Sequence, residues 1–175
     1  FEKAIQRTPN RLYSVYGPYE EPRRLIPTLI LHGLCGELPP LVSQESAHDF
    51  VYVDDVCEAY RLAATRTGQE PGAVYNVGTG TQTSLRETVE VARRVLGVTA
   101  QPNWGSMESR SWDTRVWIAD NRKIRSALGW QAASTFQDGF CLTLRWLRDH
   151  PELLRFYQAR LATAHAGHSL EAAVH

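Results

Sequence analysis

The stretch Asp49-Phe-Val-Tyr-Val-Asp-Asp-Val56 decides the fold class of this 175-residue chain. Its first five residues alternate as a β-strand does, and Asp55 followed by Glu58 has the spacing of a helix-capping box. Apolar residues then recur at helical intervals until Gly68, which we expect to end the helix. This stretch therefore predicts a strand that runs directly into a helix.

Further strands and helices alternate on both sides of this stretch, and this pattern predicts an α/β fold. Residues 165–175 carry no clear pattern, so we expect a flexible tail after a single domain, residues 1–164. The predicted strands are 11–16, 49–53 and 73–77, with a possible short strand at 98–102. The other predicted helices are 26–36, 84–97 with Ser84 and Glu87 as a capping box, 120–129 with Asp120 as its cap, and 136–164 with a break at Pro151.

Composition excludes several classes of function. Nineteen basic residues balance nineteen acidic ones, so no general field draws the chain to nucleic acid or to an anionic membrane. No run reaches the roughly 18 apolar residues that a membrane span needs. The three cysteines are widely spaced and lack zinc-ligand spacing, which predicts reduced, packed thiols and no metal site. We therefore expect a cytoplasmic protein without nucleic-acid or membrane partners.

One glycine-rich segment resembles a nucleotide-binding turn. Gly78-Thr-Gly80-Thr-Gln-Thr83 follows a predicted strand and opens a predicted helix, as a dinucleotide-binding turn does. However, Thr83 stands in place of the third glycine, and no acidic residue lies about 20 residues on to hold a ribose hydroxyl. We interpret the segment as an ordinary strand-to-helix turn.

Two side chains could contact an anion, although each also has a simpler interpretation. Arg110 lies between two helical patterns, where it is either a solvated surface arginine or a phosphate-binding fork. His48 precedes the strand at 49–53 and is a packed imidazole, a surface group or a phosphate contact. Four tryptophans between residues 104 and 130 indicate either core packing or a stacking surface for a base or sugar.

Five ordered blocks between residues 11 and 146 resemble extended short-chain dehydrogenases/reductases that act on nucleotide sugars. Arg11-Leu-Tyr-Ser-Val-Tyr-Gly-Pro18 resembles the family's RxxNVYGP strand, and Leu25-Ile-Pro27 resembles its LIP block. The stretch at 49–56 resembles the RDFVYVDDV block, Tyr75-Asn-Val-Gly78 resembles YNVG, and Leu128-Gly-Trp130 with Gly139 resembles the closing LGWxPxxxxxxG pattern. The implied fold is the C-terminal part of such an enzyme, with the last Rossmann strands and a small helical substrate-binding domain.

The resemblance implies a chemistry that this chain does not perform by itself. In the family, the N-terminal part holds NAD(P) on a glycine-rich turn and supplies a Tyr-x-x-x-Lys pair, whose tyrosine acts as general base toward a sugar hydroxyl. No Tyr-x-x-x-Lys occurs in this chain, and nothing before Arg11 could form a Rossmann turn. We therefore predict no catalytic residue here, NAD or NADP in the intact enzyme, and neither cofactor bound by this chain alone.

The site residues implied by the resemblance are those that hold the substrate and line the nicotinamide side. Ser14 stands where the family usually has an asparagine, and His48 replaces a common arginine, so details of specificity should differ. The predicted cofactor contacts are Tyr16, Gly17 and Pro18. The predicted substrate contacts are Ser14, Leu25, Pro27, His48, Arg110 and Asp113.

Two functions are open at this stage. The first is the substrate-binding portion of an NAD(P)-dependent nucleotide-diphosphate-sugar epimerase or dehydratase, with CDP- or dTDP-hexoses as expected ligands. The alternative is a non-catalytic nucleotide-sugar-binding or subunit-interaction module. In either case the strands at 11–16 and 73–77 should expose unpaired edges, so we expect association with the missing N-terminal half or self-association.

Overall fold

A computed structural model describes residues 10–67, 70, 72–107 and 115–171. Two pairs of short parallel strands form its sheet region: β1 (Asn10–Leu12) with β5 (Tyr75–Val77), and β2 (Ser14–Tyr16) with β4 (Phe50–Tyr52). The predicted strand at 11–16 is therefore divided at Tyr13. The Tyr13 N–H donates to the Val77 carbonyl at 3.1 Å, and the next N–H, that of Ser14, donates to the Asp49 carbonyl at 3.0 Å.

A third pair of strands is antiparallel and was not predicted. β3 (Ala47–His48) pairs with β6 (Thr83–Ser84), and His48 lies opposite Thr83. The possible strand at 98–102 is not a strand in the structure; the nearest pairing is an isolated bridge between Leu41 and Trp104. β3 and β4, separated only by Asp49, thus pair with two different strands, β6 and β2.

The described residues form six helices, the last four of which follow one another without an intervening strand. Several helix ends follow from the local sequence. α1 is Leu25–Leu34, α2 is Val53–Thr65, α3 is Leu85–Leu96, α4 is Arg122–Leu128, α5 is Phe136–Asp149 and α6 is Pro151–Glu171. The capping box of Ser84 and Glu87 is present, and Gly97 and Gly129 end their helices in the left-handed conformation. These features and the break before Pro151 confirm the local predictions.

The predicted caps of α2 and α4 are wrong. α2 begins at Val53, so Asp55 lies inside the first turn, where its carboxylate accepts hydrogen bonds from the N–H groups of Ala133 and Ser134 at 2.9 and 3.1 Å. Long-range hydrogen bonds have replaced the local cap. Glu58 pairs with Arg61 instead, and α2 ends at Thr65, before Gly68. The N-cap of α4 is Asn121, one residue after Asp120.

α6 continues beyond the point where we expected the flexible tail to begin. The helix extends to Glu171 and so includes much of the segment 165–175. Alanine, the residue with the strongest helix propensity, recurs at positions 159, 162, 164 and 166 and favours this continuation. Tyr157 is buried and Leu154 and Leu161 pack partly against the core, so one face anchors the first part of the helix.

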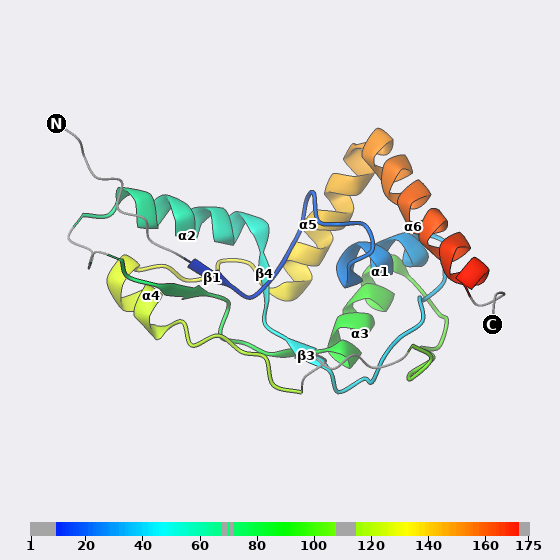
Figure 1. Ribbon diagram of the computed structural model, residues 1–175, viewed down its shortest axis with the longest axis horizontal. Coiled ribbons are helices and arrows are strands. Elements are labelled where there is room, and N and C mark those ends of the chain that lie inside the picture. Colours follow the sequence, from blue (N-terminus) through cyan, green and yellow to red (C-terminus); the bar gives the residue numbers. More distant parts are fainter. Residues whose placement is uncertain (1–9, 68–69, 71, 108–114, 172–175) are drawn as a thin grey trace.

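Two apolar cores lie on either side of the sheet region. Figure 1 shows α1, α3, α5 and α6 gathered at one end, with α2, α4 and the parallel strands at the other. The first core contains side chains of these four gathered helices, with Phe50 and Tyr52 of β4. The second contains Val51 of β4, with Tyr75 of β5 and Trp130. β4 contributes side chains to both cores and so joins the strands to the cluster of helices. This confirms the predicted arrangement of last strands plus a helical domain.

Two further sequence expectations can be compared with the structure. No helix among the described residues is long and apolar enough to cross a membrane. All three cysteines are free thiols, but Cys35 and Cys57 are exposed and only Cys141 is partly buried. The prediction of packed thiols is therefore wrong for two of them. Cys35 caps the end of α1, and Cys57 lies on the outer face of α2.

Candidate substrate-binding site

Asp49 holds together three segments that are distant in sequence. Its side chain is fully buried, and its carboxylate accepts four hydrogen bonds. Oδ1 accepts from the N–H and the hydroxyl of Thr79 at 2.8 and 2.6 Å. Oδ2 accepts from the N–H groups of Gly80 and Ala119 at 2.9 and 3.0 Å. Hydrogen bonds to a carboxylate are among the stronger ones in proteins, so Asp49 fixes the frame around the site.

This clamp explains the glycine-rich turn that resembles a nucleotide-binding loop. The amides of Thr79 and Gly80, which a phosphate would need, already donate to Asp49. Gly78 is required for a different reason, because a Cβ added there would lie 2.6 Å from the Cβ of Ala119. The structure agrees with the interpretation of this segment as an ordinary strand-to-helix turn.

Ser14 and His48, both predicted substrate contacts, are in direct contact. The Ser14 Oγ and the His48 Nδ1 are 3.1 Å apart, so they share one hydrogen bond. The imidazole also lies beside Phe50, with ring centroids 5.4 Å apart. The parallel pairing of β2 with β4 places Ser14 opposite Phe50 and so brings the two side chains together. His48 is thus half-buried and packed, and its role toward a phosphate stays a prediction.

A small cavity of about 70 Å³ opens beside this pair. It brings together three predicted substrate contacts from three separate segments: Ser14, Leu25 and His48. Pro27 is buried in the first turn of α1 and does not line the cavity. The remaining lining residues are Val15, Glu20, Arg24, Ile26 and Phe50.

Glu20 is the acidic group of this cavity, and burial controls its chemistry. Its side chain is 9% exposed and forms a 3.0 Å ion pair with Arg24. Burial raises the pKa of Glu20 to about 7, although the Arg24 guanidinium and the Gly17 amide act in the opposite direction. The carboxyl therefore changes its protonation state near neutral pH.

The predicted cofactor contacts differ in what they can offer a ligand. The Tyr16 side chain is 2% exposed, and its hydroxyl donates to the Phe136 carbonyl at 3.0 Å. Burial raises the pKa of this phenol, which keeps it neutral. Gly17 has a φ of +138°, and a Cβ there would lie 2.7 Å from Val53. Pro18 is half-buried. Contact with a nicotinamide stays a prediction, and for Tyr16 it would involve the main chain.

Arg110 and Asp113 lie outside the described residues, but the structure shows how the chain continues after them. The side chain of Gln82 donates to the Arg115 carbonyl at 2.7 Å and accepts from the Trp117 N–H at 3.1 Å. Arg115 also pairs with Glu45 at 3.0 Å. The segment is therefore anchored next to β6, whose partner strand carries His48.

Sequence reasoning missed four residues that shape this site. Asp49 was interpreted as part of a strand, and Asp55 was interpreted as a helix cap. Their actual partners were missed because they are distant in the chain. Glu20 lies in an acidic, proline-containing loop that reads as a solvated surface, and Gln82 carried no signal at all. A larger hollow of about 400 Å³, lined by residues of 37–40 and 100–106, contains none of the predicted site residues.

Known proteins with the same sequence pattern and fold are nucleotide-sugar enzymes. The chain matches the model of the family GDP-mannose 4,6 dehydratase over residues 2–143. It is 33% identical over 142 residues to the dTDP-glucose 4,6-dehydratase of Xanthomonas campestris pv. campestris. This match covers 75% of this chain and 39% of that protein.

Solved structures agree in fold. The UDP-glucose 4-epimerase of Thermotoga maritima with UDP-glucose has a TM-score of 0.70 and 28% identity, over 80% of this chain and 45% of that one. The dTDP-glucose 4,6-dehydratase of Bacillus anthracis with NAD has a TM-score of 0.71 and 26% identity, over 82% and 45%. This chain spans less than half the length of each relative. It belongs to the GDP-mannose 4,6 dehydratase family, among the extended short-chain dehydrogenases/reductases that include nucleotide-sugar dehydratases and epimerases.

Proposed function

We propose that this chain is the substrate-binding portion of an NAD(P)-dependent nucleotide-diphosphate-sugar epimerase or dehydratase. The observation that carries the proposal is the cavity that Ser14, Leu25 and His48 line together. Three side chains that the family resemblance assigns to substrate come from β2, α1 and β3, and they meet at one place. Their meeting around one cavity supports a shared role in binding.

The proposed ligands are nucleotide-diphosphate hexoses. Relatives of the chain are named for dTDP-glucose, and solved structures of other relatives hold UDP-glucose. The candidate ligands are therefore dTDP-glucose, UDP-glucose and CDP-glucose. NAD is present in several related structures and belongs, in our proposal, to the cofactor-binding part of the intact enzyme. Since this chain has no Tyr-x-x-x-Lys, we propose that it binds substrate without converting it.

Calorimetric titration of the 175-residue chain with UDP-glucose, dTDP-glucose and CDP-glucose tests this function. We expect at least one to bind with a dissociation constant below about 1 mM, which corresponds to about 4 kcal/mol of binding free energy. Ser14→Ala should weaken that binding severalfold, whereas Ser126→Ala, on the exposed face of α4, should not. Absence of binding by all three ligands would refute the proposal, and turnover with added NAD would refute its claim of inactivity.

We further propose that an exposed apolar surface receives the cofactor-binding part. Val116, Trp117 and Ile118 are 68%, 46% and 45% exposed. The centroid of the Trp117 ring lies 5.9 Å from that of Tyr13, the residue that separates β1 from β2 in the chain. Consecutive exposed apolar side chains are typical of surfaces that bind another protein segment. Light scattering of the isolated chain, with and without the cofactor-binding part, distinguishes this partner from self-association.

A further inference from the structure

One carboxylate oxygen of Glu20 has no hydrogen-bond partner of ordinary geometry among the described residues, although the nearby Gly17 amide acts on the carboxyl group. Oε1 forms the 3.0 Å ion pair with the Arg24 Nε. Oε2 is buried and, within the described part of the chain, has no hydrogen-bond partner of ordinary geometry. Most buried polar atoms in proteins have a partner, and an acceptor left without one is unfavourable. An unsatisfied acceptor on a cavity wall therefore marks a place where a ligand can supply the donor.

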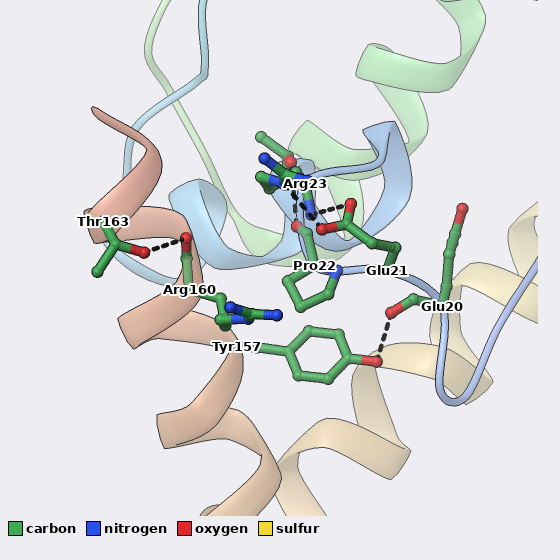
Figure 2. A network of polar contacts seen from close by, with 8 residues as sticks. Glu20, Glu21, Pro22, Arg23, Tyr157, Arg160 and Thr163 are labelled. Atoms are coloured by element: carbon green, nitrogen blue, oxygen red, sulfur yellow. Dashed lines mark hydrogen bonds and ion pairs between the residues drawn. The ribbon is translucent and has the colours of Figure 1, made fainter. Parts of the chain in front are cut away.

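The loop that carries Glu20 is held firmly by the C-terminal helix. Tyr157 of α6 donates a 2.6 Å hydrogen bond to the main-chain carbonyl of Glu20, and Figure 2 shows the phenol pointing at this loop. The Glu20 N–H donates to the Gly17 carbonyl at 3.2 Å. In the same view the Glu20 side chain points away from Tyr157. Both main-chain groups of Glu20 are thus fixed, so the carboxylate is preorganised.

The chemistry of the cavity wall limits the group that can lie against Oε2. A phosphate oxygen would face a carboxylate of the same sign of charge, which is unfavourable at short range. A hydroxyl or an N–H group would instead satisfy the buried acceptor. The other polar parts of the wall are Arg24, paired with Oε1, and the hydrogen-bonded side chains of Ser14 and His48. Leu25 and Phe50 add apolar side chains to the same wall, and a hydrogen bond is stronger in less polar surroundings.

We infer that Glu20 is a specificity-determining residue, whose Oε2 accepts a hydrogen bond from a hydroxyl or N–H group of the nucleotide sugar. This inference rests on the proposed function and adds a ligand contact in the same cavity. The diphosphate does not contact Oε2. The donor belongs either to the hexose or to the nucleoside, since both carry hydroxyl or N–H groups.

The variant Glu20→Gln tests the contact with almost no change of shape. The Arg24 guanidinium requires an acceptor, so the new amide oxygen should face Arg24 and the amide NH₂ should replace Oε2. A donor then faces the ligand's donor, and we expect UDP-glucose to bind about tenfold more weakly or worse. Glu21→Gln is the matched control, because Glu21 is exposed and pairs only with the neighbouring Arg23 at 2.9 Å.

Titration with UDP and with UDP-glucose separates the two sources of the donor. If only UDP-glucose loses affinity, the donor is a hexose hydroxyl; if both lose it equally, the donor belongs to the nucleoside. Equal affinities of the wild type, Glu20→Gln and Glu21→Gln would overturn the inference and leave the proposed function intact. Failure of the wild type to bind any nucleotide sugar would overturn both. Should Glu20→Gln unfold, as circular dichroism would reveal, Glu20→Asp keeps the charge, withdraws the oxygens and should lose affinity similarly.

Discussion

Tyr157 and Glu20 are 137 residues apart in sequence, yet the Tyr157 hydroxyl lies 2.6 Å from the Glu20 carbonyl oxygen. The hydrogen bond joins α6 to the loop that lines the candidate substrate cavity. Tyr157 is 4% exposed, so the phenol lies inside the apolar contact between α6 and the rest of the helical core. The C-terminal helix thereby supports the site without contacting the cavity itself.

Tyr157→Phe should remove this support and little else. We expect a loss of about 1 kcal/mol in the free energy of unfolding, the usual net contribution of one hydrogen bond. The affinity for UDP-glucose should fall severalfold, because Glu20 is then less well fixed. Urea denaturation and calorimetry measure the two effects. Gln158→Ala, at an exposed position beside it, should change stability by no more than about 0.5 kcal/mol. Unchanged stability of Tyr157→Phe would show that the hydrogen bond is dispensable.

Asp49→Asn should be the most destabilising conservative substitution at this site. The amide NH₂ of Asn would face N–H donors that, in the wild type, donate to a carboxylate oxygen. We therefore expect the free energy of unfolding to fall by an amount on the order of 3 kcal/mol or more. Asp54→Asn, at an exposed position in the first turn of α2, should lose about 1 kcal/mol or less. Thermal unfolding of the two variants provides the comparison. Similar losses in both would mean that the Asp49 clamp adds little.

Stability should depend on pH through Glu20. Burial raises its pKa from the usual 4.5 to about 7, so the folded chain holds this proton more tightly than the unfolded chain does. The resulting stabilisation is complete below about pH 4.5 and is lost as the pH rises through 7. Between pH 5 and 8 we expect the wild type to lose about 2 to 3 kcal/mol relative to Glu20→Gln, which cannot titrate. Urea unfolding across this range measures the difference. Parallel pH profiles would contradict the assignment.

Gln82→Ala should affect ligand binding more than folding. Its two hydrogen bonds anchor the chain at Arg115 and Trp117, directly after the segment that carries the predicted contacts Arg110 and Asp113. We expect stability to fall by about 1 kcal/mol or less, because Gln82 is exposed. Affinity for UDP-glucose should fall severalfold, whereas Thr81→Ala should bind as the wild type does. If affinity does not change, residues 115–117 do not position a ligand-binding segment.

Predictions from the sequence succeeded where the causes are local. The capping box of Ser84 and Glu87, the glycine after α3 and the break before Pro151 depend only on neighbours within a few residues. The same reasoning failed at Asp55, because its partner Ala133 is 78 residues away, and a distant partner outweighed a good capping pattern. Neither the hydrophobic periodicity nor the spacing of a local motif can predict such a contact.

The candidate site was predictable only in part for the same reason. The family resemblance supplied Ser14, Leu25 and His48, and the structure gathers them around one cavity. Glu20 was missed because a glutamate in a polar loop gives no indication that the assembled fold will bury it. Burial is a property of the assembled fold. In Glu20, burial both raises the pKa of the carboxyl group and leaves Oε2 without a hydrogen-bond partner of ordinary geometry among the described residues.

The order in which this chain folds should follow from the way its strands are paired. Asn10 pairs with Tyr75, and Ser14 pairs with Phe50, both in parallel. Closing such long loops costs entropy before any strand contact is gained, so pairing of this kind slows folding. α5 and α6, adjacent in the chain and in contact, have no such delay. The α5–α6 pair should therefore form early, and the substrate cavity should be completed only when the segment 10–16 joins its two distant partners.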